Sequence, residues 1–304
     1  MPSTQTPLRY PGGKSQLKWL VREMISEVCP RISAYAEPYC GGAGIAVDLL
    51  LGGGMSRIYL NDADRGIASF WFAVKNEPDR LIDEIMSADV SVDKWLEVRE
   101  ERKRILSRNG DTACDDDFYS FRLAFLTFYL NRTNVSGVID GGCIGGMSQK
   151  GNYKIDCRFN KETLVKKVRR IAEHGDRISV SSEDGVRFFT DTLPKLLRED
   201  DLTPLDLFAY IDPPYVKQGR NLYFNSMDLD AHRALSDALK NWTCKYWFLS
   251  YDDNELIREL YKEFDRRLLS VRYSASSHDE ALELGIFPEP FREFRGNLKE
   301  WVTI

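Results

Sequence analysis

Apolar residues follow two different patterns along this chain, and the pattern changes twice. Toward both ends, short apolar runs alternate with stretches in which apolar residues recur every three or four positions, which is typical of strands alternating with helices. Between residues 76 and 130 only the wider spacing is found, and it predicts helices without strands. The sequence therefore predicts an α/β domain made of residues 1–75 and 161–304, interrupted by a mainly helical insert at residues 76–160.

The same spacing predicts where the individual elements lie. The predicted strands are at residues 34–38, 57–60, 153–159, 177–182, 206–211, 245–250, 267–273, 282–287 and 300–304. The predicted helices near the two ends are at residues 14–28, 45–51, 161–172, 228–239 and 254–264, together with one that follows residue 64 and ends near residue 75. The first two strands and the helix between them form a strand–helix–strand unit, which is the building block of a parallel sheet.

The predicted insert has an aromatic core and a glycine-rich end. Aromatic residues at helical spacing are expected to pack inside it: Phe121, Phe125, Phe128 and Tyr129. Residues 137–151 then contain six glycines. Long loops without secondary structure are usually functional, so this loop is a candidate for ligand contact.

Composition and charge narrow the class of protein. Of the 304 residues, 43% are hydrophobic and 29% are charged, which excludes a disordered or low-complexity chain. The formal net charge of −5 weighs against a nucleic-acid partner, because such proteins usually carry a surplus of basic residues. However, residues 141–170 hold eight basic and two acidic side chains beside the glycine-rich loop. We therefore expect one local basic surface that can contact phosphates.

Other features bear on location and metal binding. No apolar run reaches the length of a membrane span, and the first residues lack the apolar core of a signal peptide. The six cysteines form no Cys-X-X-Cys pair, and the three histidines have no ligand spacing to any cysteine. We expect a cytoplasmic protein with no membrane segment and no metal site.

A glycine-rich segment follows the predicted strand 34–38. Its sequence, Glu37-Pro-Tyr-Cys-Gly-Gly-Ala-Gly44, would bring backbone N–H groups and a helix N-terminus close to a ligand. Asp62 lies at the end of the next strand, where an acidic side chain can accept both hydroxyls of a ribose. Together these features predict a site for an adenosine-type cofactor. The alternative is a glycine-rich turn with a surface aspartate.

A second motif, Asp212-Pro213-Pro214-Tyr215, directly follows the predicted strand 206–211. Ligands of open α/β sheets bind beyond the carboxyl ends of the strands. The prolines have no N–H groups, so this loop presents acceptors to which a flat, amino-bearing ring could donate while it stacks on Tyr215. The alternative is a proline turn in which Tyr215 only packs. A third motif, Arg9-Tyr-Pro-Gly-Gly-Lys14, lacks the full phosphate-loop pattern and decides nothing by itself.

The order of these motifs is more specific than any one of them. YPGGK, EPYCGGAG, NDAD, an Asn-Arg segment with nearby glycines and then DPPY follow one another from residue 9 to about residue 287. This series resembles the Dam-like (D12 class) DNA adenine-N6 methyltransferases. The resemblance implies a Rossmann-like, S-adenosylmethionine-dependent methyltransferase sheet, with the insert as a target-recognition subdomain. It also implies site-specific methyl transfer to a flipped adenine of double-stranded DNA by direct in-line attack.

The resemblance also implies roles for individual residues. The cofactor-binding positions are Tyr10, Lys14, Glu37, Pro38, Tyr39, Gly41, Gly42, Gly44, Asp62, Asp184 and Asp212. The catalytic positions are Asp212, Pro213, Pro214 and Tyr215. The DNA-binding positions are Asn131, Arg132 and Asn134, to which the basic stretch adds Lys150, Lys154 and Arg158.

Some features stay open. After Asn134 the chain has Val135-Ser136-Gly137 where familiar members of the family have an aromatic residue and Asn-Gly, so the recognised DNA sequence is undetermined. The alternatives are adenine-N6 methylation of RNA and a catalytically silent DNA-binding relative. A cognate restriction endonuclease acting on the same site is a further expected partner. His232 is expected to be structural or to lie on a helix surface, and residues 250–252 are expected to line the wall of the pocket.

Overall fold

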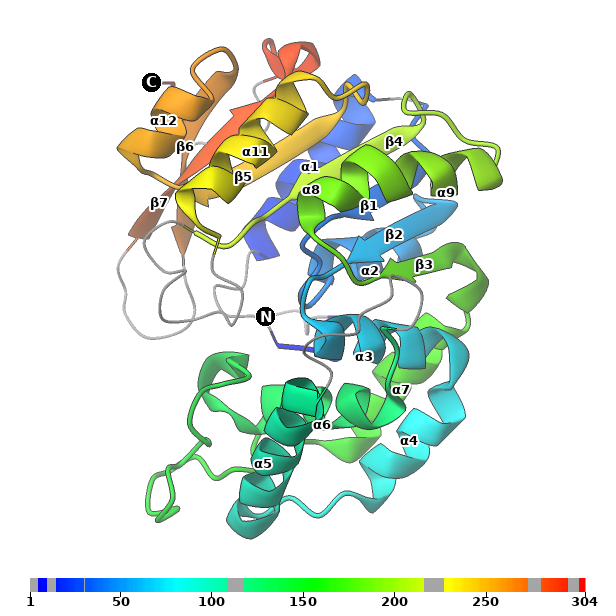
Figure 1. Ribbon diagram of the computed structural model, residues 1–304, viewed down its shortest axis with the longest axis vertical. Helices are drawn as coiled ribbons and strands as arrows, with labels where there is room; N and C mark the ends of the chain where they lie inside the picture. The colour runs from blue at the N-terminus through cyan, green and yellow to red at the C-terminus, as the bar shows by residue number, and fades with distance from the viewer. Residues whose placement is uncertain are drawn as a thin grey trace.

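The computed structural model describes residues 5–9, 15–29, 31–108, 118–215, 227–272, 280–294 and 301–303. Its centre is one eight-stranded sheet with the order β3-β2-β1-β4-β5-β7-β6-β8 (Figure 1). The strands are β1 (Ala34–Glu37), β2 (Arg57–Asn61), β3 (Ile178–Ser181), β4 (Leu207–Ile211), β5 (Trp247–Asp252), β6 (Asp265–Arg272), β7 (Glu280–Phe287) and β8 (Trp301–Thr303). The first five strands are parallel, whereas β7 is antiparallel to both β5 and β6. The predicted α/β, Rossmann-like fold class is confirmed.

Helices cover both faces of this sheet, so its central strands are apolar on both sides. The helices of eight or more residues are α1 (Ser15–Val28), α2 (Gly44–Leu51), α3 (Arg65–Asn76), α4 (Pro78–Ser87), α5 (Val92–Arg108), α6 (Phe121–Thr133), α7 (Lys161–Ala172) and α11 (Leu229–Lys240). Tyr35 and Phe208 point into the core that contains α1, α2 and α3. Their neighbours Ala36 and Ala209 point into the core on the opposite face, which α11 covers. This alternation is the period of two expected of strands.

Helices α4 to α7 lie with α3 on one side of the sheet and form the lower lobe in Figure 1. Helix α6 lies between α3 and α5 and is buried along nearly its whole length. The predicted aromatic core of this region is confirmed, because Phe121, Phe125, Phe128 and Tyr129 are all buried. Helix α7, which follows the predicted insert, packs on α4 and on α3 and so joins this lobe to the sheet.

The predicted strand at residues 153–159 is wrong. Residues 151–160 form bends and turns, with the Cys157 N–H donating to the Lys154 carbonyl and the Phe159 N–H donating to the Asp156 carbonyl. Ile155 and Phe159 are buried while the residues between them are exposed. The apolar positions that suggested a strand are loop side chains that dock on the helical lobe.

A helical segment at residues 185–199, for which no element is predicted, follows β3. It consists of α8 (Gly185–Arg187), a π-helical turn η3 (Phe188–Thr192) and α9 (Leu193–Glu199). Its short, differently wound pieces break the regular 3.6-residue spacing that reveals longer helices. With α11 and the short helix α12 (Glu255–Leu260), it covers the second face of the sheet.

Close packing of α3 on α6 leads to a testable prediction about Gly66. A Cβ at this position would lie 2.1 Å from the Thr127 hydroxyl oxygen, so Gly66→Ala should lower the free energy of unfolding by about 1–3 kcal/mol. Urea denaturation measures the change. Gly54→Ala is the matched control, because its nearest non-neighbouring atom would be 3.9 Å away. Equal stability of the two variants would contradict the packing.

Candidate active site

Four loops meet at one edge of the sheet, each following a parallel strand. Residues 37–44 follow β1, Asp62 follows β2, Asp184 lies after β3, and residues 212–215 follow β4. The neighbours of β1 lead in opposite directions, to β2 and β3 on one side and to β4 and β5 on the other. Such a switch point opens a crevice at the carboxyl ends of the strands, where α/β proteins bind ligands.

The glycine-rich loop after β1 is shaped by its backbone. Gly41 and Ala43 both adopt left-handed conformations, with φ of 43° and 44°. The Gly41 N–H donates to Asp62 Oδ2 at 2.8 Å, and the indole of Trp71 donates to the Gly41 carbonyl at 2.9 Å. Gly44 begins α2, is exposed, and would have open space around a Cβ. A ligand can therefore come close to the backbone at the N-terminus of this helix.

The N-terminal segment reaches the same loop. The hydroxyl of Thr6 donates to the Gly42 carbonyl at 2.6 Å. Two further residues predicted to bind cofactor, Tyr10 and Lys14, lie outside the described residues.

Glu37 holds the loop from inside. Its Oε1 accepts from the Tyr35 hydroxyl at 2.9 Å and from the Ala46 N–H in the first turn of α2 at 3.1 Å. Burial raises the pKa of Glu37 to about 8. The carbonyl of Pro38 accepts from the side-chain amide of Asn61 at 2.9 Å. These two predicted cofactor residues thus position the loop, with their described contacts made to the protein itself.

Asp62 joins three strands. Oδ2 accepts from Gly41, Oδ1 accepts from the Asp64 N–H at 2.9 Å, and the Asp62 carbonyl accepts from the Ser182 hydroxyl at 3.1 Å. Burial, followed by the neighbouring Asp64 carboxylate, raises the pKa of Asp62 to about 7. The backbone N–H groups therefore orient the carboxylate. A further hydrogen-bond donor that approaches it would stabilise its charged form.

Asp184 and Tyr39 lie where the loops after β3 and β1 come together. Oδ1 of Asp184 caps α8 by accepting from the N–H groups of Val186 and Arg187. The adjoining Gly185 packs on the ring of Tyr39, since a Cβ there would lie 2.3 Å from Tyr39 Cζ. The loops after β1 and β3 are consequently in direct contact.

The 212–215 loop is held by the neighbouring strand β5. The Ser250 hydroxyl donates to Asp212 Oδ1 at 3.1 Å and lies 2.9 Å from the Tyr210 hydroxyl. Since Ser250 has one proton and donates it to Asp212, Tyr210 is the donor to Ser250. Burial raises the pKa of Tyr210 far above its usual value, which keeps that proton in place. The result is a chain of donors that ends at the carboxylate.

Tyr215 is anchored by the antiparallel strand β7. Its hydroxyl donates to Glu283 Oε1 at 3.0 Å, and its ring lies 6.2 Å from that of Tyr251. The Tyr251 hydroxyl is 2.7 Å from Nδ1 of His232, a buried histidine whose pKa is lowered by burial. His232 is therefore a buried, internally bonded residue. Ser250 and Tyr251 contact the motif, and the lining of a pocket wall by residues 250–252 stays a prediction. Glu283 was not predicted; an acid inside the apolar run Leu282-Glu-Leu-Gly-Ile-Phe287 is the signal that could have revealed it.

The family model described as D12 class N6 adenine-specific DNA methyltransferase matches residues 10–275 of this chain. The chain belongs to this family. The match contains all four loops of the sheet edge and the whole helical lobe. The expectation of an adenine-specific DNA methyltransferase is thereby confirmed.

Curated relatives agree with the family. The type II methyltransferase M.MjaIII of Methanocaldococcus jannaschii is 23% identical over 275 residues, covering 88% of this chain and 83% of the relative. The type II methyltransferase M1.LlaDCHI of Lactococcus lactis subsp. cremoris is 20% identical over 281 residues, covering 91% and 82%. A solved structure, the rRNA methyltransferase aviRa from Streptomyces viridochromogenes, matches 88% of this chain and 83% of that chain with 10% identity and a TM-score of 0.34.

The described part of the D12 enzyme contains neither a membrane-spanning helix nor a cluster of metal-ligating side chains. None of its described helices is long and apolar enough to cross a membrane. Within the same ranges, no three His, Cys, Asp or Glu side chains are grouped so that they could hold a metal ion.

The asparagines predicted to bind DNA are buried, and their side chains form hydrogen bonds with backbone groups of the protein. Asn131 accepts from the Arg9 N–H at 2.7 Å and donates to the carbonyls of Arg9 and Gly137 at 2.6 and 2.9 Å. Asn134 accepts from the Trp95 indole at 2.6 Å, and its amide group donates to two carbonyls of the glycine-rich loop. Both amides therefore link the start of that loop to other parts of the protein.

Arg132, between them, is also engaged internally. It donates to the Arg158 carbonyl at 2.7 Å and to the Pro7 carbonyl at 3.3 Å. Burial, followed by the charges of Arg9 and Arg158, lowers the pKa of Arg132 to about 9, which leaves it charged at neutral pH. Its contacts join residue 158, which follows the glycine-rich loop, to the N-terminal segment.

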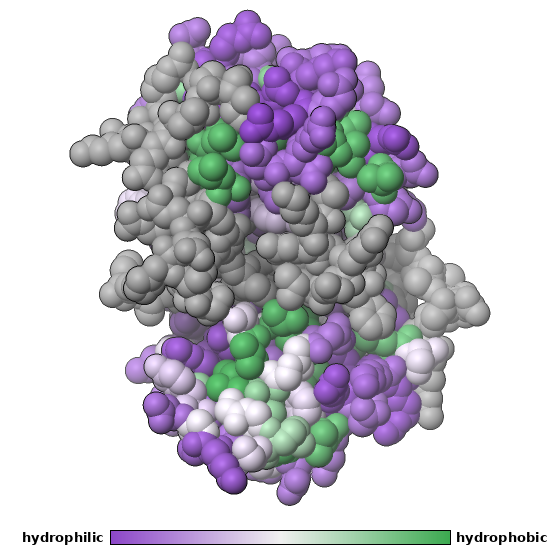
Figure 2. Space-filling model, turned by 90° about the vertical axis from the view of Figure 1, so that its left-hand side faces the viewer, coloured by the Kyte–Doolittle hydropathy of each residue, from purple (hydrophilic) through white to green (hydrophobic). Residues whose placement is uncertain are grey.

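The basic residues of that region are exposed. Lys150, Lys154 and Arg158 are accessible, and the Arg158 guanidinium lies 5.9 Å from the exposed ring of Tyr153. The loop projects from the lower lobe in Figure 1 and faces the viewer in Figure 2, where pale and hydrophobic residues border hydrophilic ones. This surface offers exposed cations beside exposed loop backbone, both of which can contact phosphates.

The role of Asn131 can be tested by stability. Asn131→Ala removes three hydrogen bonds and leaves buried backbone groups unpaired, so the free energy of unfolding should fall by about 2–3 kcal/mol in urea denaturation. Asn241→Ala, which removes an exposed amide that donates to Asp237 on α11, is the matched control and should cost about 0.5 kcal/mol or less. A loss no larger than that of the control would refute the internal role.

Proposed function

We propose that this D12 enzyme transfers a methyl group from S-adenosylmethionine to N6 of an adenine flipped out of double-stranded DNA, at a specific sequence and by direct in-line attack. The observation that carries the proposal is the placement of the 212–215 loop. It lies at the switch point beside the β1 loop, and its carboxylate and aromatic ring are each held by a neighbouring strand.

The residues at the sheet edge fit an adenosine-type methyl donor. Open space at Gly44 admits a ligand to the helix N-terminus, and Asp62 keeps lone pairs for ribose hydroxyls beyond its described backbone bonds. Asp184 caps α8 with Oδ1, and we assign its Oδ2 as an acceptor for a ring amine of the cofactor. When bound, S-adenosylmethionine supplies an electrophilic methyl group. We extend the cofactor set to Tyr10 and Lys14 on the family resemblance.

Asp212 and the Pro213 carbonyl act on the target amine. The lone pair of an adenine amino group is delocalised into the ring, so the nitrogen is a poor nucleophile until it pyramidalises. Acceptors for its two N–H groups stabilise the positive charge that develops in the transition state. Ser250 orients the Asp212 carboxylate in advance, and such positioning can contribute several kcal/mol, up to about 7–11 kcal/mol, to catalysis. The proton can leave after transfer, so a strong base is not needed.

Tyr215 holds the extruded base. A base inside a duplex is out of reach of this pocket, and flipping costs a few kcal/mol. Stacking of the base on an aromatic ring contributes about 1–3 kcal/mol of favourable free energy, which offsets part of this cost. The hydrogen bond to Glu283 keeps the Tyr215 ring from turning away when no base is present.

DNA would lie along the glycine-rich loop. Lys150, Lys154 and Arg158 are the proposed phosphate contacts, while Asn131, Arg132 and Asn134 contribute by holding that loop in shape. On this basis we propose residues 76–160 as a target-recognition subdomain and the rest as the catalytic domain. Because both relatives are type II methyltransferases, a restriction endonuclease of the same specificity is the proposed partner.

The function is tested by expressing the enzyme in cells without DNA methylation and sequencing their DNA for N6-methyladenine. We expect one consistent sequence context. Asp212→Ala should bind DNA normally but reduce methyl transfer by about 10²–10³-fold, because it removes a transition-state acceptor. Asp230→Ala, on the exposed side of α11 where its partner is Arg233, is the control and should be fully active.

Three results would reject the proposal. Unmodified DNA, or labelled methyl appearing in RNA alone, would exclude a DNA enzyme. Full activity of Asp212→Ala would remove that residue from the site. Failure of the wild type to bind S-adenosylhomocysteine in calorimetry would favour a silent DNA-binding protein.

Cofactor binding should depend on pH through Asp62. With its pKa raised to about 7, Asp62 is mostly ionised at pH 8 and mostly protonated at pH 6. Since the carboxylate is the better acceptor for ribose hydroxyls, affinity for S-adenosylhomocysteine should fall by about tenfold from pH 8 to pH 6. Asp62→Asn should bind weakly at both pH values. An unchanged pH dependence in that variant would assign the effect to another group.

A further inference from the structure

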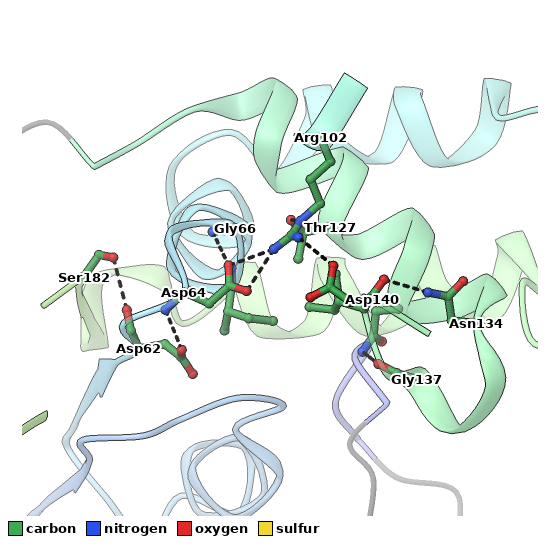
Figure 3. Close-up of polar contacts among 12 residues, drawn as sticks. Asp62, Asp64, Gly66, Arg102, Thr127, Asn134, Gly137, Asp140 and Ser182 are labelled. Atoms are coloured by element: carbon green, nitrogen blue, oxygen red, sulfur yellow. Dashed lines mark hydrogen bonds and ion pairs between the residues drawn. The ribbon is translucent and has the colours of Figure 1, made fainter. Parts of the chain in front are cut away.

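Arg102 is an almost fully buried cation in the helical lobe, and its side chain meets three separate segments. It lies on α5 and is 2% exposed. Nη2 donates to both carboxylate oxygens of Asp64 at 3.2 and 2.9 Å, and Nε donates to the Thr127 hydroxyl on α6 at 3.1 Å. Nη1 lies 3.5 Å from Asp140 Oδ1 (Figure 3). One guanidinium thus connects the turn after β2, helix α6 and the glycine-rich loop.

The contact with Asp64 connects Arg102 to Asp62, the acid proposed to bind ribose. Asp64 donates its N–H to Asp62 Oδ1, and its own Oδ1 accepts from the Gly66 N–H at 2.7 Å at the start of α3. Its two carboxylate oxygens also receive Arg102. The turn that orients Asp62 is consequently stabilised by an arginine from the inserted helices.

The contact with Asp140 connects Arg102 to the glycine-rich loop, which is part of the proposed DNA-binding surface. Asp140 lies in the glycine-rich loop, two residues past the carbonyl of Val138 that Asn134 holds, and its side chain is 47% exposed. Figure 3 shows Asp64 and Asp140 on opposite sides of the Arg102 guanidinium. A planar fork of donors can serve two carboxylates at once, which the single ammonium of a lysine does poorly.

A buried arginine with two carboxylates can be purely structural, but here each carboxylate adjoins a different proposed binding site: Asp64 donates to Asp62, and Asp140 lies in the glycine-rich loop. Each ligand would order one end of the shared ion-pair cluster. The second ligand then meets a guanidinium and a carboxylate that are already fixed, and it loses less conformational entropy on binding. By linkage, the effect is the same in both directions.

We propose that Arg102 is a positioning residue that couples the cofactor site to the DNA-binding loop through the Asp64–Arg102–Asp140 cluster. This rests on the proposed function, since it assumes that Asp62 binds ribose and that the loop binds DNA. Arg102 touches neither ligand and acts through the two aspartates.

The test measures DNA affinity by fluorescence anisotropy with and without saturating S-adenosylhomocysteine. The probe is a duplex that contains the sequence found by methylation mapping. In the wild type, the ligand should tighten DNA binding at least about fivefold, within the usual range of coupling between sites. In Asp140→Asn this ratio should fall below about twofold, while the affinity for S-adenosylhomocysteine alone stays within about twofold of wild type. Arg102→Lys should lose the coupling and also bind S-adenosylhomocysteine more weakly.

Arg122→Gln is the matched control. It breaks another ion pair between α6 and α5, from Arg122 to Glu101 at 2.6 Å, which does not reach either site. We expect it to keep the wild-type ratio. Asp140 is half exposed, so its variant should fold even if Arg102→Lys does not.

Specific results would overturn the inference. These are an unchanged ratio in Asp140→Asn, an equal loss of coupling in Arg122→Gln, or a wild-type enzyme that binds both ligands without mutual effect. Absence of binding to either ligand would instead reject the proposed function, so the two failures are distinguishable.

Discussion

The carboxylate of Asp62 is the point from which the crevice is organised. It accepts N–H groups from the loops that follow β1 and β2, and the backbone of the same residue is tied to β3. Parallel strands bring these loops to one edge but leave their relative positions loose, because loop backbone has few partners of its own. One partly buried acid restricts that freedom. Its raised pKa shows that this position costs free energy when the acid is charged.

The loop at residues 212–215, proposed to be catalytic, is held in the same way by different groups. Its prolines give it a restricted backbone that forms few hydrogen bonds of its own. Instead, β5 and β7 supply polar side chains from otherwise apolar strands, Ser250 to Asp212 and Glu283 to Tyr215. Polar groups buried at such a place are expensive unless paired, so their presence in the sheet is best explained by the loop that they hold.

Charge is divided between two parts of the molecule. The protein carries a net charge of −5, yet the glycine-rich loop and the start of α7 are basic. Part of that charge is used internally: Lys161 and Lys167 donate to carbonyls of Met86 and Thr6. The remaining exposed cations form a limited surface. If this surface binds DNA as proposed, its small size favours salt-sensitive binding of one DNA segment over general attraction to nucleic acid.

Local chemistry was enough to predict most of the strands and longer helices and the position of each motif, but not the helical segment at residues 185–199. Strand β4 and its tetrapeptide, the loop after β1 and helix α7 are all visible in the sequence, because hydrophobic period, prolines and glycines act on neighbouring residues. The same reasoning fails at residues 153–159, where apolar side chains dock on helices from a loop. Only the tertiary structure shows that Asn131 and Asn134 point inward, that Glu283 meets Tyr215 across 68 residues, or that Arg102 lies between Asp64 and Asp140. The partners of Glu283 and Arg102 lie far apart along the chain. Buried polar groups must be paired, and which groups can pair depends on which surfaces the fold brings together.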